Sequence, residues 1–154
     1  MNGLNRTMAE ALASRYEELG GRVKALAEAL SEEQFWKKAF AFGNSFGHLA
    51  LHLTGNLNYY LGAQIASTGY IRDRPREFTE TESPSKEETL KRLDAAVAMA
   101  ARTIRAQSES DWERVYAAKG EEDAKNRLTI VLRCLTHLDH HLGQMQYLSF
   151  ALGK

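Results

Sequence analysis

Cysteine is almost absent from this sequence, and proline and net charge are scarce as well. Among 154 residues there is one cysteine, Cys134, which excludes an internal disulfide framework and a zinc site built from several cysteines. Two prolines leave room for long uninterrupted helices. Lys and Arg number 20, as do Asp and Glu, so the chain lacks the basic excess of a protein that binds nucleic acid without regard to sequence. We therefore expect no nucleic-acid partner.

Long apolar runs are also missing. No stretch approaches the roughly 18 apolar residues that a membrane-spanning helix needs, and no basic-then-apolar signal peptide opens the chain. We therefore expect no membrane partner and predict a cytoplasmic protein. The remaining composition is that of an ordinary globular protein, with 44% hydrophobic and 26% charged residues. The length predicts one domain over residues 1–154, because domains cluster at about 100–150 residues.

Apolar residues recur at steps of three and four along most of the chain, which is the helical period. The first such stretch predicts a helix over residues 4–30, with a kink or short break at Gly20-Gly21. Four more helices are expected over residues 31–40, 45–67, 85–106 and 127–152. Ser31 and Ser85 each begin a capping-box sequence, which is typical of a helix start.

The four long helices predict an all-α fold, a four-helix bundle. Two connections are long for a compact domain, in which loops have a median length of about 4–6 residues. The first, residues 69–84, is rich in charge and contains both prolines. The second, residues 107–125, leads to Asn126, which we expect to cap the last helix. The bundle should therefore have long crossover connections.

The histidines are the most informative residues. All five fall in two clusters on two of the predicted long helices: His48, His52, His137, His140 and His141. His48 and His52 are four residues apart, and so are the outer two of the second cluster, so each pair projects within about 40° of one direction. Two such imidazoles can reach one metal ion, and a third from a facing helix would leave positions open for water or substrate. This spacing favours metal binding over histidines that merely belong to the core.

Four short motifs carry a resemblance to a known family. They are Asn44-Ser45, then His52-Leu53-Thr54-Gly55-Asn56-Leu57, then Arg72-Asp73-Arg74 with Glu77-Phe78, and finally His137-x-x-x-His141-x-Gly143-Gln144. From about residue 26 to residue 148, the chain resembles the DinB/YfiT-like superfamily of metal-binding four-helix bundles. The resemblance implies that His52, His137 and His141 bind a divalent metal. It assigns no ligand role to His48, which is then a core histidine or a support for the ligands, with a four-histidine site as the alternative.

Several residues beside these histidines could support them. Asn56 follows His52 by four residues and Gln144 follows His141 by three, so either amide could orient an imidazole or could be a plain amide between helices or at the surface. Cys134 could face the site, although a buried cysteine is more often a small apolar filler, which we favour.

Three arginines alternate in the first long connection, at Arg72, Arg74 and Arg76. They could bind an anionic group of a substrate. We favour the view that at least two of them are solvated or form ion pairs with acidic residues of the same segment, among them Glu77.

Three neutral imidazoles leave a divalent ion its full positive charge, so it can lower the pKa of a bound water towards about 7 or hold a thiol as its thiolate. Zinc, nickel and iron all accept imidazole, so the ligand type does not choose among them. Members of the superfamily include thiol-dependent transferases and an isomerase that use a low-molecular-weight thiol. The resemblance therefore implies a metal-dependent enzyme, an S-transferase or a hydrolase, with a small-molecule substrate or thiol as its partner.

Two other functions remain open at this point. The first is a non-catalytic metal-binding or stress-response protein of the same fold, which a closed, four-coordinate protein site would favour; an open position facing a pocket would favour the enzyme. The second is a structural bundle with vacant histidines. The apolar helix faces and the resemblance also predict a homodimer.

Overall fold

Helices make up the regular structure of the computed structural model, which describes residues 3–79 and 83–153. The four long ones are α1 (Gly3–Glu28), α3 (Phe46–Leu57), α5 (Lys86–Arg105) and α7 (Arg127–Leu152). α3 continues directly into a π-helical segment, η1, which spans Asn58–Ala63. Three short helices stand in the connections: α2 (Glu32–Trp36), α4 (Arg76–Thr79) and α6 (Glu109–Trp112). Within the described ranges, β pairing is limited to one isolated bridge between Val115 and Asn126. The predicted all-α fold is confirmed.

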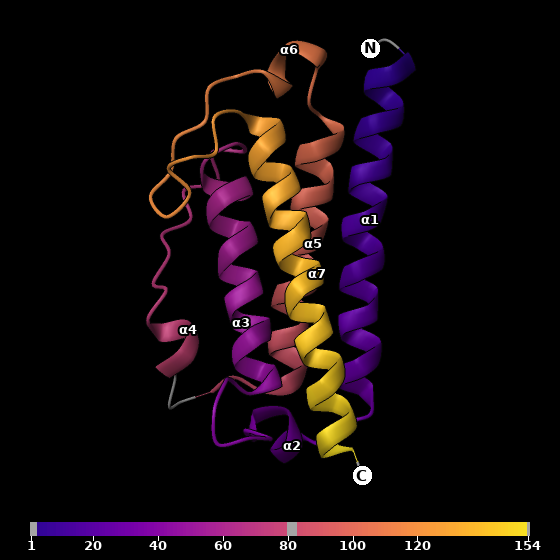
Figure 1. The fold of residues 1–154 in the computed structure, drawn as a ribbon, viewed down its shortest axis with the longest axis vertical. Coiled ribbons are helices and arrows are strands. Elements are labelled where there is room, and N and C mark those ends of the chain that lie inside the picture. Colours follow the sequence, from indigo (N-terminus) through magenta and orange to yellow (C-terminus); the bar gives the residue numbers. More distant parts are fainter. Residues whose placement is uncertain (1–2, 80–82, 154) are drawn as a thin grey trace.

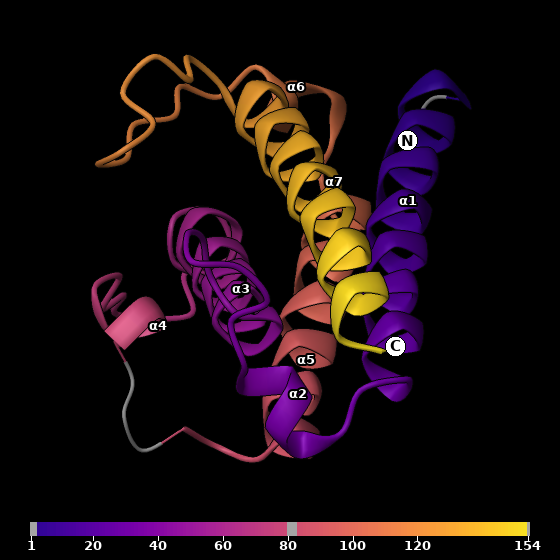
Figure 2. The same ribbon diagram turned by 60° about the horizontal axis from the view of Figure 1, so that its bottom comes forward.

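The long helices form a bundle in which each packs against two neighbours (Figure 1). α1 contacts α5 and α7, and α3 contacts the same two helices. α1 and α7 run in one direction, whereas α3 and α5 run in the other (Figure 1). Because α3 and α5 are parallel, the chain between them must return along the length of the bundle. It does so on the outside of α3, where α4 packs (Figure 2). The described part of the first predicted crossover, residues 69–79, lies in this segment. The second long connection, residues 107–125, joins α5 to α7 at one end of the bundle and is therefore not the crossover that was predicted (Figure 1).

Short polar side chains begin the helices where the sequence predicts. Ser31 makes both hydrogen bonds of a capping box at the start of α2. Ser85 and Asn126 cap α5 and α7 by accepting the backbone N–H three residues ahead. Ser45 caps α3 in the same way, through the N–H of His48. These caps satisfy backbone donors that every helix start leaves open.

The first helix differs from the prediction. α1 runs from Gly3 to Glu28 without the break predicted at Gly20-Gly21. Gly20 faces α5, where a Cβ in its place would lie 3.0 Å from Cγ2 of Val97. The missing side chain therefore lets α1 and α5 pack closely, and their packing keeps the helix continuous.

Two helix ends also come earlier than predicted. α2 ends at Trp36 rather than at residue 40, because the next residue, Lys37, has extended backbone. The helix that begins after Ser45 ends at Ala63 rather than at residue 67. The chain then turns through Ser67 and Gly69, which both have positive φ.

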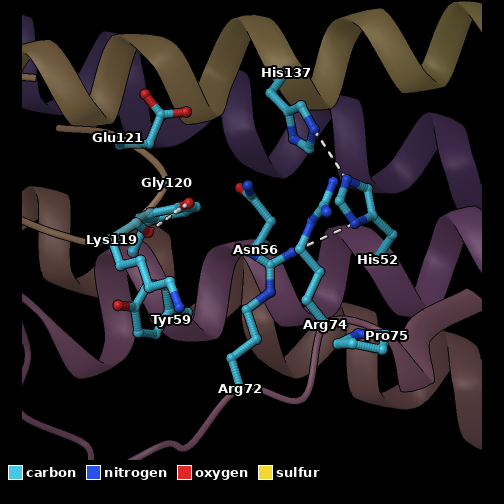
Figure 3. A pocket seen from close by; sticks show the side chains of 11 residues that line it. His52, Asn56, Tyr59, Arg72, Arg74, Pro75, Lys119, Gly120, Glu121 and His137 are labelled. Atoms are coloured by element: carbon cyan, nitrogen blue, oxygen red, sulfur yellow. Dashed lines mark hydrogen bonds between the residues drawn. The ribbon is translucent and has the colours of Figure 1, made fainter. Parts of the chain in front are cut away.

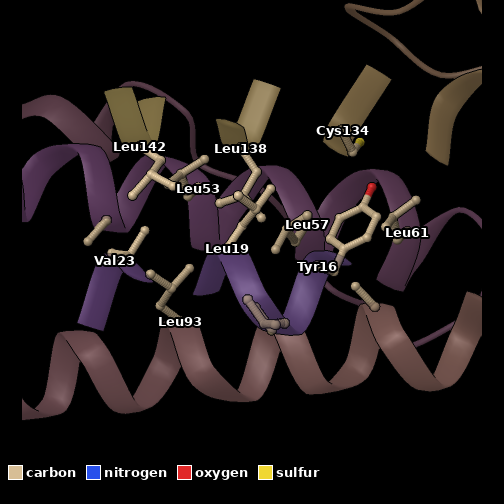
Figure 4. Packing of buried hydrophobic residues seen from close by; sticks show 14 of the residues in the cluster. Tyr16, Leu19, Val23, Leu53, Leu57, Leu61, Leu93, Cys134, Leu138 and Leu142 are labelled. Atoms are coloured by element: carbon tan, nitrogen blue, oxygen red, sulfur yellow. The ribbon is translucent and has the colours of Figure 1, made fainter. Parts of the chain in front are cut away.

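The core lies along the bundle axis and is filled mainly by aliphatic side chains. Figure 4 shows part of it: Tyr16, Leu19, Val23, Leu53, Leu57, Leu61, Leu93, Cys134, Leu138 and Leu142. Tyr16 is fully buried, and its hydroxyl donates to the carbonyl oxygen of Val131 at 2.6 Å. Cys134 is 2% exposed in this core and serves there as a small apolar residue. Among the described helices, none combines the length and the apolar character needed to cross a bilayer.

Candidate metal centre

Three histidines from two adjacent helices converge at one point. His52 projects from α3, and His137 and His141 project from consecutive turns of α7. The Nε2 atom of His137 lies 3.1 Å from Nε2 of His52 and 3.0 Å from Nε2 of His141. Among the described His, Cys, Asp and Glu residues, these three form the group whose ligand atoms lie within 4.8 Å of one another. The structure thus brings together the three histidines that the family resemblance selects.

A buried ion pair holds the outer side of His52. Nδ1 of His52 donates to Oε2 of Glu77 at 2.8 Å. Arg72 donates two hydrogen bonds to the same carboxylate, from Nε at 2.7 Å and from Nη2 at 3.0 Å. The side chains of Arg72 and Glu77 are only 8% and 7% exposed. The arginine compensates the buried carboxylate, and the carboxylate fixes the proton of His52 on Nδ1.

The motif glycine of α3 makes room for this ion pair. A Cβ built on Gly55 would overlap Oε1 of Glu77 and would lie 3.3 Å from Nε of Arg72. The crossover can therefore press its carboxylate against α3 only because residue 55 has no side chain.

His141 has an analogous partner on its own helix. Its Nδ1 donates to Oε1 of Gln144 at 2.7 Å, while Nε2 of Gln144 lies 3.3 Å from Nε2 of the exposed His140. Gln144 is thus placed to orient an imidazole, one of the two roles the sequence left open for it. In contrast, Nδ1 of His137 is buried and has no hydrogen-bond partner among the described residues.

Few protons are available on the Nε2 atoms of His52, His137 and His141. The partners on Nδ1 leave Nε2 of His52 and His141 as lone-pair acceptors, so a neutral His137 can supply at most one proton to the cluster. Burial, followed by the charges of His141 and His52, lowers the pKa of His137 to about 3. Burial also lowers the pKa of His141. Near neutral pH, Nε2 of His137 therefore lies about 3 Å from the other two Nε2 atoms with too few protons to join them, an arrangement that fits a cation.

The donor set also fits a divalent transition metal. A tetrahedral ion with Zn–N bonds of about 2.0–2.1 Å would hold its nitrogens about 3.3 Å apart, close to the separations here. A carboxylate or carbonyl oxygen on the far ring nitrogen is the usual support of a metal-binding histidine. Glu77 and Gln144 provide this support for two of the three.

A cavity of about 680 Å³ opens beside the histidines. Figure 3 shows His52 and His137 at one end of it and Tyr59 and Lys119 at the other. Its lining residues come from α3, η1, α7 and both long connections: His52, Asn56, Tyr59, Tyr60, Arg72, Arg74, Pro75, Lys119, Gly120, Glu121 and His137. Asn56 lies on this wall with a buried Oδ1 that has no hydrogen-bond partner in the described part of the chain.

His48 lies apart from the group. Its Nδ1 is 2.7 Å from Oγ of Ser45, and its ring packs at 5.4 Å from the ring of Trp36. Although His48 and His52 are one helical turn apart, the His48 ring lies against Trp36 of α2 and not beside His52. The four-histidine alternative is therefore not the arrangement that the structure shows.

Reasoning from sequence missed the link between the crossover and the site. The ion pair of Arg72 with Glu77 agrees with the interpretation favoured for these arginines. The contact of Glu77 with His52, 25 residues earlier, was not foreseen. The motif that contains Glu77 was the available signal, but neither spacing nor helical period assigns its carboxylate to a particular histidine.

Comparison with known proteins identifies the family of the chain. A search among curated proteins found no match to the chain. The sequence profile of the DinB superfamily matches residues 15–145, which include the three histidines and their partners Arg72, Glu77 and Gln144. Since the match covers most of the 154 residues, the chain belongs to the DinB superfamily.

Proposed function

We propose that this protein is a metal-dependent enzyme in which His52, His137 and His141 bind one divalent ion, zinc, nickel or iron. The observation that carries the proposal is the convergence of three Nε2 atoms beside a cavity large enough for a substrate. Ligand cavities are typically about 300–1,000 Å³, and this one lies within that range.

The side chains around the histidines have distinct tasks in this proposal. Glu77 and Gln144 hold the rings of His52 and His141 with their Nε2 lone pairs directed inward. Arg72 holds the Glu77 carboxylate in place through two hydrogen bonds. When bound, a divalent ion supplies Lewis-acid chemistry, lowering the pKa of a water or of a low-molecular-weight thiol. The cavity walls would hold the molecule to be attacked, as in an S-transferase or a hydrolase.

An open site favours an enzyme over a non-catalytic metal-binding or stress-response protein. A closed structural site would use four protein ligands. The group here contains three within the described residues, and two of them, His52 and His137, line the cavity. This leaves the cavity side of the centre free for a small molecule, which is the arrangement that catalysis requires.

Metal content tests the proposal. We expect about one equivalent of metal in protein purified without a histidine tag, and its loss in His52→Ala and His141→Ala. His140→Ala is the matched control, because His140 is exposed on the same helix and outside the group. Metal retained without His52 would refute the ligand assignment. No metal after loading with zinc, nickel or iron would leave a structural bundle.

A second measurement separates an enzyme from a closed metal site. In protein loaded with cobalt(II), we expect 2-mercaptoethanol to change the visible absorption spectrum, because a thiol can enter the position facing the cavity. A spectrum that does not respond to the thiol would favour the non-catalytic function.

A further inference from the structure

We propose that the cavity beside the three histidines selects small molecules with carboxylate or phosphate groups, and that Arg74 and Lys119 each bind such a group, one at either end of the cavity. The inference relies on the proposed function for the reacting end of the molecule. The anion site itself consists of protein side chains.

The cavity carries positive charge in a chain that is neutral overall. Its charged lining residues are Arg72, Arg74, Lys119 and Glu121. Arg72 is paired with Glu77, and the Glu121 carboxylate shares Arg133 with Asp123, at 2.7 and 2.6 Å. For Arg74 and Lys119, the described residues provide no ion pair. Within the described residues, Arg74 and Lys119 are thus lining cations without an ion pair, in a protein with 20 basic and 20 acidic residues.

Arg74 is positioned near the metal-binding end. Its guanidinium lies over the ring of Phe78, 5.9 Å from the centroid, and that ring in turn lies 5.0 Å from the ring of His52. Figure 3 shows the Arg74 side chain beside His52. The stacking limits where the guanidinium can go, and its planar set of N–H groups matches the two oxygens of a carboxylate or phosphate.

Lys119 is held at the other end by contacts of its backbone. The hydroxyl of Tyr60 donates to the carbonyl oxygen of Lys119 at 3.2 Å. The next residue, Gly120, has φ +92° and approaches Tyr60 so closely that a Cβ would lie 2.6 Å from the hydroxyl oxygen. The hydroxyl of Tyr116 donates to the carbonyl oxygen of Tyr60 at 3.0 Å. The second long connection is thus attached to η1, which keeps the backbone of the exposed Lys119 beside the cavity.

Part of the cavity wall is aromatic. Tyr59 and Tyr60 project from η1, a π-helical segment of the kind often found at functional sites. A cation at each end and an aromatic part of the wall favour a molecule with an anionic group towards each end and an apolar body. They disfavour amines and other cationic substrates, which would be repelled.

Binding of simple anions tests the inference directly. The probes are succinate, inorganic phosphate and the neutral succinamide, titrated by calorimetry or by amide NMR shifts. We expect an anion to bind, to weaken about tenfold in Arg74→Gln and in Lys119→Gln, and to weaken further with added NaCl. Two controls should leave the affinity unchanged: Arg22→Gln, exposed on α1, and Lys125→Gln, exposed in the same connection as Lys119.

The outcomes are distinct. Tighter binding of phosphate would identify a phosphate site and tighter binding of succinate a carboxylate site, and either supports the inference. Equal binding of succinamide and succinate, unchanged affinity in both cavity variants, or no binding at millimolar concentration would overturn it.

Titrations with and without metal separate this inference from the proposed function. An anion that binds only to metal-loaded protein, with no effect of Arg74→Gln or Lys119→Gln, would refute the anion site and leave the metal centre standing. An anion that binds through these two residues in a protein that takes up no metal would support the anion site and refute the metal centre.

Discussion

Glu77 is the residue that connects the crossover to the histidines. Its carboxylate is 7% exposed and accepts hydrogen bonds from Arg72, which donates two, and from Nδ1 of His52. A buried carboxylate is stable only when its charge is compensated, so the arginine and the histidine depend on each other through it. Any metal affinity that rests on the orientation of His52 should therefore depend on Glu77.

Replacing this carboxylate should weaken metal binding without removing a ligand. For Glu77→Gln we expect a loss of about tenfold in zinc affinity, because the amide keeps the shape but accepts the Nδ1 proton less strongly. Competition with a chromophoric chelator measures the effect. Glu87→Gln, exposed on α5, is the control. Unchanged affinity in Glu77→Gln would mean that His52 needs no anionic partner.

The pKa of His137 predicts how the stability of metal-free protein depends on pH. The folded value is about 3 against 6.5 for an ordinary histidine, so below pH 6.5 the unfolded chain takes up a proton that the folded chain refuses. The free energy of unfolding should therefore fall as the pH is lowered through this range. Between pH 7 and 5 we expect a loss of about 1 kcal/mol, less than the full shift implies because the ring is only partly buried.

Urea unfolding with EDTA present, at pH 7 and 5, measures this loss. In His137→Gln the decrease should be smaller by that amount, because the titrating ring is gone. Equal decreases in the two proteins would show that His137 does not control the acid sensitivity above pH 5.

Helices α3 and α4 are in close contact at Gly55. Gly55 lies in mid-helix, where alanine would ordinarily be favoured by about 1 kcal/mol. The Glu77 carboxylate occupies the space that a Cβ would need. The contact between the helix and the crossover thus outweighs helix propensity at this position.

Two glycine substitutions separate propensity from contact. Gly55→Ala should displace Glu77, lower the free energy of unfolding by about 1–3 kcal/mol and weaken zinc binding. Gly21→Ala, where a Cβ meets nothing within 4 Å on α1, should raise the free energy of unfolding by up to about 1 kcal/mol and leave zinc binding unchanged. Denaturant unfolding and chelator competition measure both. If Gly55→Ala were stabilising with intact metal affinity, the close contact would be unimportant.

On the surface of the molecule, several aromatic side chains are exposed near the end of α7. Phe42, Tyr147 and Phe150 are 80%, 75% and 59% exposed, and Phe40 stacks on Phe42. Large exposed apolar patches commonly mark contact surfaces. The homodimer predicted from sequence remains a prediction, and this face is where we expect it to form.

Light scattering during size-exclusion chromatography tests the dimer. We expect the parent to have the mass of a dimer and the double variant Phe42→Ser, Tyr147→Ser to shift towards a monomer of 17.3 kDa with unchanged helical circular dichroism. Leu4→Ser is the control, because Leu4 is an exposed apolar residue on α1, away from this face. It should not change the mass of the protein in solution. A monomeric parent would refute the dimer, and a dimeric double variant would place its interface elsewhere.

Features that depend on near neighbours were predictable from sequence. Helical period and capping residues located the long helices, and the four-residue spacing placed His137 and His141 on one face of α7, because these signals act within one or two turns. Spacing could not choose between His48 and His52, since both lie on the same face of an isolated helix. The resemblance to the DinB superfamily made that choice, and the structure places His52 beside the other two.

An all-α bundle and a pair of histidines able to share a metal ion can be predicted from the amino-acid sequence. The folded structure is needed to show that α1 continues through Gly20-Gly21, that Glu77 contacts His52, and that Arg74 and Lys119 line one cavity. These features join residues far apart in the chain, beyond the reach of local sequence signals. Their positions follow from the parallel course of α3 and α5, which sends the crossover back along the bundle, and from the packing that a missing Cβ at Gly20 and Gly55 permits.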